Sequence, residues 1–376
     1  MAWSEAIGDI FKAVKARRVP AGGIAPEEIA TALYRGILGR DPDLPGLAQK
    51  AEILRSGEVL EHIVRSFVDS PEFRARFLAT VVPTVELPDL VAAMPDKYQQ
   101  QIVADAPMTV YVARDDADMA AMAGLIEKHR FYDRFGVWLP VIDLDKQITA
   151  AIVRGLGATS CFELGCFTGP VLSLLADAGV DIVGAEVSHL AFIFAYPNVR
   201  DAMLFGDLLG LSVPRRFDMV LCMDVLEHVN PLLLDRYIDK LVSLLAPSGF
   251  LYLNAPMWGR DPIFGLFEEP YLAEWHAVGD DANWRHWPCD ERGWPIHGHL
   301  VWASSPWWEQ KFVEHGLVRD TVIESAIHGV LSPVFESARG RKCLFVLRRP
   351  DWAGSSEETA RRVAETIRQV PGLPST

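Results

Sequence analysis

The 376-residue sequence predicts an α/β fold with a mostly parallel sheet, preceded by an all-helical part. Three observations lead to this prediction. Between residue 108 and about residue 350, short apolar runs alternate with helical patterns, which is typical of a parallel sheet. The residues before 83 show helical patterns only. Hydrophobic residues make up 50% of the chain, so it can bury a sizeable core.

The first 82 residues are predicted to form a helical domain. Residues 3–18 have an amphipathic pattern with basic residues near its end, and we expect a helix docked on its own protein. Peripheral membrane contact is the alternative. Pro26 suits the first turn of a second helix, and the turn RDPDLPG follows that helix. Three more helices come next, the last of them begun by Ser70 and Pro71.

Within this part, the stretch LYRGILGRDPDLPGL, followed by LRSGEVLEHIVRSFVDSPEF, resembles a short bacterial helical domain of unknown function. The resemblance implies a bacterial source and an accessory role, because such domains often accompany glycan-modifying or surface-related proteins. No cluster of acids, histidines or cysteines in it suggests a site. The stretch 83–107, which contains several prolines, predicts a linker to the next domain.

Five apolar runs are predicted as strands of the sheet, and helical segments fit between them. They read TVYVA, SCFEL, DIVGAE, FDMVLCM and GFLYLNAP. The run RGRKCLFVLRR at 339–349 predicts a closing strand with its basic residues in solvent. Residues 108–350 are therefore assigned to the α/β domain. Residues 351–376 are predicted to add a C-terminal helix and tail, with Ser355 and Glu358 as a capping box.

Charge and cysteine content limit the classes of partner. The net charge of −14 falls entirely after residue 82, since acids and bases are equal in number before it, and an acidic body repels nucleic acid. The five cysteines form no C-x-x-C pair and are odd in number, which argues against a disulfide framework or a zinc site and suits a reducing cytosol. No apolar run is long enough to predict a transmembrane segment.

The sequence SCFELGCFTGP predicts a ligand-binding loop after a strand. It lacks the lysine of a Walker phosphate loop, and the carboxylate of Glu163 beside Gly165 and Gly169 would repel pyrophosphate but favour a cation. Glu186 ends the next strand and can accept both ribose hydroxyls. Asp207 follows a further apolar segment and can accept from an adenine amino group. This pattern suits a sulfonium amino-acid nucleoside.

Five stretches, FELGCFTG, VGAE, GDLL, FDMVLCMDVLEHV and LLAPSGFLYLNAP, resemble in order and spacing the class I S-adenosylmethionine-dependent methyltransferases. The resemblance implies a doubly wound, seven-stranded Rossmann-like sheet with an antiparallel last strand beside the fifth. It also implies S-adenosylmethionine as cofactor and S-adenosylhomocysteine as product. The residues that it assigns to the cofactor are Glu163, Gly165, Cys166, Gly169, Glu186, Asp207, Leu208 and Met223. Phe167 stands where many members have glycine, so we expect the loop backbone to differ there.

The motif MDVLEHV allows two interpretations. If it is helical, Asp224, Glu227 and His228 lie on one face. In the favoured interpretation no metal is bound, and His228 is a general base or orients the site. In the alternative, the resemblance to members that methylate catechol-like or ribose hydroxyls implies a divalent ion such as Mg²⁺, with His299 as fourth ligand.

Residues 257–308 are predicted to form an irregular insertion after the fifth strand, and they contain eight of the eleven tryptophans. Tryptophan faces stack on sugars, so a carbohydrate acceptor is one interpretation; a lid packed on the domain and a homodimer interface are the others. His297 and His299 would face one side of a strand. His299, with His297 and His228 as alternatives, is the predicted base.

The predicted activity is therefore O-methylation of a sugar or surface glycan by direct SN2 transfer in the bacterial cytoplasm. Three alternatives stay open, of which a nucleic-acid methyltransferase is the third, since the acidic charge counts against it. One is an O- or N-methyltransferase for an aromatic or amino-sugar small molecule. Another is a non-catalytic scaffold that keeps the fold and uses the tryptophan-rich segment for binding.

Overall fold

The computed structural model divides into two compact units, Met1–Thr84 with Trp138–Pro140 and the remainder, and each is described by itself. The residues described are 25–38, 40–57, 63–64, 66–67, 70, 72–73, 85–134, 142–267, 269–270, 272–278, 282–283 and 285–373. The helix predicted over residues 3–18 lies outside them. No helix among the described residues is long and apolar enough to cross a membrane.

The first unit contains helices α2 (Pro26–Leu38) and α3 (Leu44–Arg55), as the sequence predicted. Asp43 caps α3, because its carboxylate accepts the Gly46 N–H at 2.7 Å. A small core of Tyr34, Leu38, Ile63 and Phe67 holds this unit together.

The second unit is built on a seven-stranded sheet of order β14-β15-β7-β6-β3-β4-β5. Its strands are β3 (Ser160–Leu164), β4 (Asp181–Glu186), β5 (Met203–Phe205), β6 (Phe217–Met223), β7 (Leu245–Asn254), β14 (Val318–Arg319) and β15 (Leu344–Arg348). The five strands from β3 to β7 are parallel, and β15 pairs antiparallel to β7. The predicted seven-stranded sheet with its antiparallel last strand is thus confirmed.

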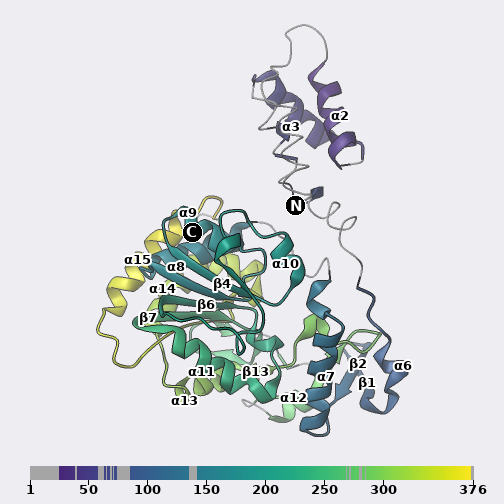
Figure 1. The fold of residues 1–376 in the computed structure, drawn as a ribbon, viewed down its shortest axis with the longest axis vertical. Coiled ribbons are helices and arrows are strands. Elements are labelled where there is room, and N and C mark those ends of the chain that lie inside the picture. The colour runs from purple at the N-terminus through teal and green to yellow at the C-terminus, as the bar shows by residue number, and fades with distance from the viewer. Residues whose placement is uncertain are drawn as a thin grey trace. The chain divides into compact units, whose positions relative to one another are not determined.

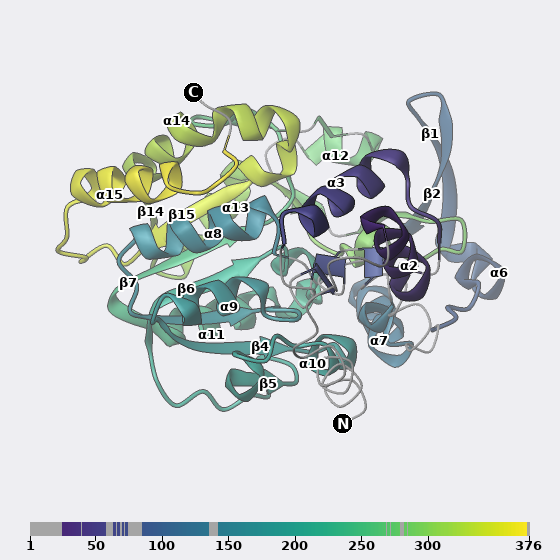
Figure 2. The ribbon, with the colours of Figure 1, turned by 90° about the horizontal axis from the view of Figure 1, so that it is seen from above.

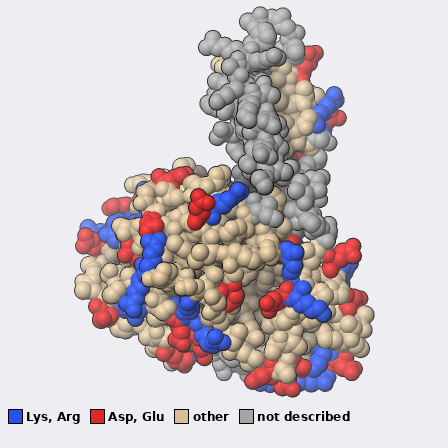
Figure 3. Space-filling view, in the orientation of Figure 1, with Lys and Arg blue, Asp and Glu red and all other residues tan. Residues whose placement is uncertain are grey.

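Helices cover both faces of this sheet, which is why its central strands are apolar throughout. Figures 1 and 2 show α8, α9 and α15 on one face, and Figure 1 shows α11 and α13 below the other. Their bounds are α8 (Leu144–Gly155), α9 (Pro170–Asp177), α11 (Leu234–Leu244), α13 (Ser305–Glu314), α14 (Thr321–Ser337) and α15 (Ser356–Arg368). On the surface drawn in Figure 3, acidic and basic side chains are interspersed.

The predicted C-terminal helix is present as α15, with Ser355 at its N-cap, and it is part of the main core. Its buried face joins the core around the sheet through Val363 and Ile367. Its polar side chains are also tied to α8: the Arg362 guanidinium donates to the Gly155 carbonyl at 2.6 Å, and the Thr366 hydroxyl donates to the Ala151 carbonyl at 2.9 Å.

A separate antiparallel sheet, of order β1-β2-β12, corrects two further predictions. Its strands are β1 (Tyr98–Val103), β2 (Ala106–Val112) and β12 (His286–Cys289). The run TVYVA therefore does not belong to the parallel sheet, and residues 85–107 are not a linker. Ala104 and Asp105 both have positive φ, 48° and 66°, which gives the tight two-residue hairpin that joins β1 to β2.

The tryptophan-rich segment forms a second hydrophobic core rather than an exposed surface. Trp258, Trp275, Trp287, Trp294 and Trp302 are buried in it. The β1–β2 sheet and helix α7 (Asp116–Lys128) supply the rest of this core through Tyr111, Met119 and Met122. Trp308 is buried in the main core, and Trp284 lies outside the described residues. The segment is therefore packed on its own domain, and these buried rings do not offer faces for a sugar.

The packing of α15 on α8 gives a test of the fold. A methyl group on Gly155 would lie 2.6 Å from the Val363 Cα atom, so we expect Gly155→Ala to destabilise the protein by about 1–3 kcal/mol. Thermal unfolding measures the change. Gly124→Ala in α7 is the control: its methyl group meets open space and should stabilise by up to about 1 kcal/mol. An unchanged melting temperature for Gly155→Ala would mean that α15 does not pack there.

Candidate active site

The candidate site lies at the carboxyl edge of the sheet, where the loops after β3, β4 and β6 meet because these three strands are parallel neighbours. The loop after β3 is the predicted glycine loop. Its Gly165 contacts the loop after β6, since a methyl group on Gly165 would lie 2.4 Å from the Val225 Cγ2 atom. The predicted cofactor loop and the MDVLEHV motif are thus adjacent.

The glycine loop adopts three left-handed residues. Gly165 and Gly169 have φ of 69° and 77°, and both lack room for a side chain. Phe167 has φ of 48°. The expectation of a different backbone at Phe167 is therefore wrong: the phenylalanine takes the conformation that glycine would take. Its N–H donates to the Glu186 Oε2 atom at 2.8 Å, which stabilises the strained residue.

Glu186 lies at the end of β4, as predicted, and its buried carboxylate connects three loop segments. Besides the Phe167 N–H, it accepts the N–H groups of Val187 and Ser188, each at 2.8 Å to Oε1. Burial raises the pKa of Glu186, and these three hydrogen bonds oppose that rise by favouring the carboxylate.

Two buried polar groups near the loop have no hydrogen-bond partner among the described residues. They are the Oε2 atom of Glu163 and the hydroxyl of Thr168. Burial raises the pKa of Glu163 well above its usual value, and the nearby charge of Lys146 partly counters this. A buried polar atom without a partner is costly, so these two groups are candidates for facing a ligand.

The other predicted cofactor residues divide into two groups. The side chains of Cys166 and Leu208 are buried in the main core, which leaves their backbone for a ligand. Met223 lies half-buried at the end of β6. Asp207 is exposed, accepts the Leu209 N–H at 2.8 Å and also accepts the hydroxyl of Tyr237.

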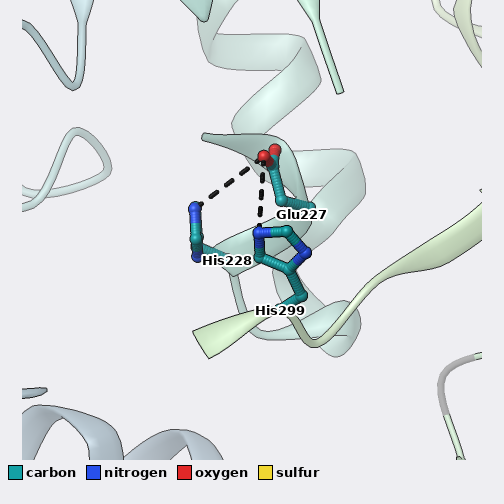
Figure 4. A group of neighbouring side chains, drawn as sticks. All are labelled: Glu227, His228 and His299. Carbon is teal, nitrogen blue, oxygen red and sulfur yellow. Dashed lines mark ion pairs between the residues drawn. The ribbon is translucent and has the colours of Figure 1, made fainter. Parts of the chain in front are cut away.

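Glu227, His228 and His299 form a compact group (Figure 4). The Oε1 atom of Glu227 lies 3.8 Å from His228 Nε2 and 4.0 Å from His299 Nε2. One potential ligand atom from each residue lies within 4.8 Å of the other two. Both carboxylate oxygens of Glu227 are buried without a hydrogen-bond partner in the described part of the chain.

Burial drives all three groups toward their neutral forms. It lowers the pKa of His228 to about 4 and, together with the neighbouring His228, lowers the pKa of His299 well below its usual value. It raises the pKa of Glu227 well above the usual range, with the nearby Asp224 adding to the rise. The neutral form of both imidazoles is therefore favoured.

Two predictions about local structure here are wrong. Asp224 has φ of 54° and precedes the short 3₁₀ turn Leu226–His228, so no helix aligns it with Glu227. Its carboxylate instead accepts the Arg341 guanidinium at 2.7 Å, outside the group. His297 and His299 do not share a strand, because His297 lies in a 3₁₀ turn with φ of 57° and is exposed. Their rings still approach to 5.5 Å.

Two residues at the site differ from expectation: Tyr132 was not predicted as a site residue, and Arg341 was predicted to lie in solvent. The Tyr132 ring lies 5.3 Å from the ring of His228, and its hydroxyl donates to the Gly298 carbonyl at 3.2 Å. No motif marks this tyrosine, since only the fold brings it to the site. Arg341 was expected in solvent at a strand end, but it pairs with Asp224 and, at 3.3 Å, with Asp145.

Comparisons with known proteins agree with this geometry. Residues 136–318 match a family model described as a methyltransferase domain. The ubiquinone biosynthesis O-methyltransferase of Albidiferax ferrireducens is 24% identical over 168 residues, 42% of this chain and 65% of that protein. Its namesake from Pseudomonas fluorescens is 27% identical over 163 residues, 41% of this chain and 67% of that protein.

Among solved structures, 1,6-didemethyltoxoflavin-N1-methyltransferase of Burkholderia thailandensis, with bound 1,6-didemethyltoxoflavin and S-adenosylhomocysteine, is 14% identical. The match covers 59% of this chain and 89% of that one, with a TM-score of 0.39.

The family match covers residues 136–318, and this part of the chain is similar to a methyltransferase domain. The match agrees with the predicted resemblance to the class I S-adenosylmethionine-dependent methyltransferases. The chain spans about two thirds of the length of the curated relatives that it matches.

The left-handed Phe167 can be tested by comparing two variants that both lose the ring. Only glycine adopts this φ without steric cost, so we expect Phe167→Gly to be more stable than Phe167→Ala by about 1 kcal/mol. Urea unfolding measures the difference. The usual order, with alanine the more stable, would contradict the left-handed conformation.

Proposed function

We propose that this enzyme transfers the methyl group of S-adenosylmethionine to a hydroxyl oxygen of a small-molecule acceptor. The observation that carries the proposal is the adjacency of two features at one edge of the sheet. The glycine loop and Glu186 form a cradle suited to a nucleoside. Gly165 of this loop contacts Val225, which precedes Glu227 and His228 in the loop after β6, and His299 lies beside those two residues.

In this proposal the cofactor spans the carboxyl edge from β3 to β5. Glu163, Gly165, Gly169 and the backbone of Cys166 surround its methionine end, where the unpaired oxygen of Glu163 favours a cation. Glu186 accepts from the ribose hydroxyls. Asp207 and the backbone of Leu208 lie at the adenine edge, and Met223 lines the path between adenine and the transferred methyl group.

The ribose assignment is tested by Glu186→Gln. The glutamine amide has one oxygen in place of two, so it can no longer accept at both positions. We therefore expect the dissociation constant for S-adenosylhomocysteine to rise about 10–100-fold. Isothermal titration calorimetry measures it. Asp181→Asn is the matched control, since it removes an exposed carboxylate from the other end of the same strand. Equal affinity of Glu186→Gln and the wild type would remove Glu186 from the cofactor site.

The acceptor is proposed to be a hydroxyl because two imidazoles and a carboxylate, which can hydrogen-bond to a hydroxyl, lie together beside the cofactor loop. Transfer is an SN2 displacement at the methyl carbon, so positioning supplies most of the rate and a base assists loss of the hydroxyl proton. His299 is the proposed base because its neutral imidazole lies at this group. His228 orients the site next to it, and His297 lies at the exposed rim.

A small molecule is favoured over a sugar or surface glycan as acceptor. The sugar interpretation depended on exposed tryptophan faces, and those described in the second core are buried. The names of the curated relatives, which are O-methyltransferases of ubiquinone biosynthesis, also favour a small-molecule hydroxyl.

The acceptor class is tested by transfer of labelled methyl from S-adenosylmethionine into fractionated extract. We expect label in small molecules. For His299→Asn, we expect turnover to fall about 100-fold or more while the affinity for S-adenosylhomocysteine stays unchanged. Label in polysaccharide would overturn the small-molecule acceptor. A wild-type protein that binds no S-adenosylhomocysteine would favour the non-catalytic alternative.

As an alternative to His299 as the base, we propose that Glu227, His228 and His299 hold a divalent ion. The support is the buried Glu227 carboxylate, whose oxygens have no donor among the described residues, beside two neutral imidazoles. One carboxylate with two imidazoles suits a transition ion such as Mn²⁺, Fe²⁺ or Zn²⁺ better than Mg²⁺, which prefers oxygen ligands. A bound ion would supply Lewis acidity to an acceptor oxygen. Asp224 is not in this set, because it pairs with Arg341.

Metal binding is tested by the melting temperature with excess Mn²⁺, Zn²⁺ or Mg²⁺. We expect Mn²⁺ or Zn²⁺ to raise the melting temperature of the wild type by several degrees, and Mg²⁺ to raise it less. The rise should disappear in Glu227→Gln and persist in Glu314→Gln, which changes an exposed glutamate. No rise with any ion would leave the histidines to act without metal.

A further inference from the structure

The segment Phe131–Asp133 connects three parts of the enzyme through three consecutive side chains. Phe131 packs on Trp294 of the second core, with ring centroids 5.7 Å apart. Tyr132 packs on His228 of the candidate active site. Asp133 bonds to the loop that follows Glu186. Neither the predicted motifs nor the proposed chemistry gives this segment a role.

Asp133 is an unusual residue for a surface turn because it is only 5% exposed. Its Oδ1 atom accepts the Ser188 hydroxyl at 2.9 Å and the His189 N–H at 2.7 Å. Its Oδ2 atom pairs with the guanidinium of Arg130. A buried carboxylate must be hydrogen-bonded or paired to be tolerated. Apart from Arg130, the partners of the Asp133 carboxylate are Ser188 and His189, which both follow β4.

Ser188 links Asp133 to Glu186 because it hydrogen-bonds to both carboxylates. Its N–H donates to Glu186 Oε1 at 2.8 Å, while its hydroxyl donates to Asp133. The hydroxyl also caps α10 (His189–Ile193) by accepting the Ala191 N–H at 3.4 Å. Moving Ser188 would therefore move one of the three donors that orient the Glu186 carboxylate.

We propose that Asp133 is a positioning residue for the cofactor, which holds the loop after β4 so that Glu186 presents its carboxylate to the ribose. This inference rests on the proposed role of Glu186. Asp133 does not contact the nucleoside in this account; it acts through Ser188. The segment that bears Asp133 also packs on the second core and on His228, so it ties the ribose cradle to the acceptor side of the site.

The experiment compares ligands that share the nucleoside. We expect Asp133→Ala, which removes the acceptor for both bonds, to raise the dissociation constants of S-adenosylhomocysteine and of 5′-methylthioadenosine, which lacks the amino acid, by the same factor of about tenfold. The KM for S-adenosylmethionine should rise similarly, with little change in kcat at saturating cofactor. Asp118→Ala is the matched control, since that carboxylate also bonds to other segments, to Lys97 and the Arg114 N–H, but not to the loop after β4.

A double-mutant cycle with Ser188→Ala measures the coupling between Asp133 and Ser188, and it remains informative where a single variant loses stability. If Asp133 acts through Ser188, the two substitutions should be non-additive, and the double variant should bind S-adenosylhomocysteine no more weakly than the worse single variant. Additive losses would overturn the proposed path. Unchanged affinity of Asp133→Ala for both nucleosides, with only a lower melting temperature, would mean that Asp133 only stabilises the start of α10, and it would overturn the proposal.

The outcomes separate this inference from the proposed function. If the wild type binds S-adenosylhomocysteine and Glu186→Gln weakens that binding, but Asp133→Ala does not, only the positioning role fails. If Glu186→Gln binds as well as the wild type, the ribose assignment fails, and the inference for Asp133 fails with it.

Discussion

The three backbone hydrogen bonds to the Glu186 carboxylate are the constraint on which the geometry of the cofactor edge depends. They join the glycine loop after β3, the end of β4 and the start of α10 at one buried group. The bond to Phe167 offsets the cost of a left-handed aromatic residue, which lets the loop keep its course without a central glycine. A carboxylate so placed has a fixed direction before any ligand arrives, and that preorganisation lowers the cost of binding.

Burial without charge pairing distinguishes the neighbouring groups from ordinary surface acids and bases. The structure buries Glu163, Glu227 and His299 and leaves carboxylate oxygens of both glutamates without a hydrogen-bond partner among the described residues. Desolvation therefore shifts their pKa values toward the neutral forms. Such a site would attract a cationic ligand strongly, because a sulfonium or a metal ion would restore the charge balance that ionised carboxylates require. Asp224, by contrast, is neutralised by Arg341 and has no such need.

The parallel sheet and the loops at its carboxyl edge could be predicted from the sequence because motifs and strand periodicity are local signals. The errors arose where the partner of an element decides its place. The alternation in TVYVA predicts a strand equally well in either sheet, and only its pairing with β1 and β12 assigns it. The apolar stripe of α15 predicts a buried face but does not say that α8 lies beneath it. Phe167 and Asp224 adopt positive φ because tertiary hydrogen bonds stabilise them, and residue preference alone argues against both.

The tryptophan-rich insertion packs in a second core, separate from the loops proposed to hold the cofactor. The second core combines residues before the sheet with residues after β7, and it carries His299 at its border. The N–H groups of Leu300 and Val301 both donate to the Glu227 carbonyl, at 2.6 and 3.0 Å, so the insertion is attached to the backbone of the residue that it faces. The packing of the insertion therefore holds His299 next to Glu227. Substitutions within this core would change the acceptor side without touching Gly165, Glu186 or Asp207, because those residues belong to the loops after β3, β4 and β5.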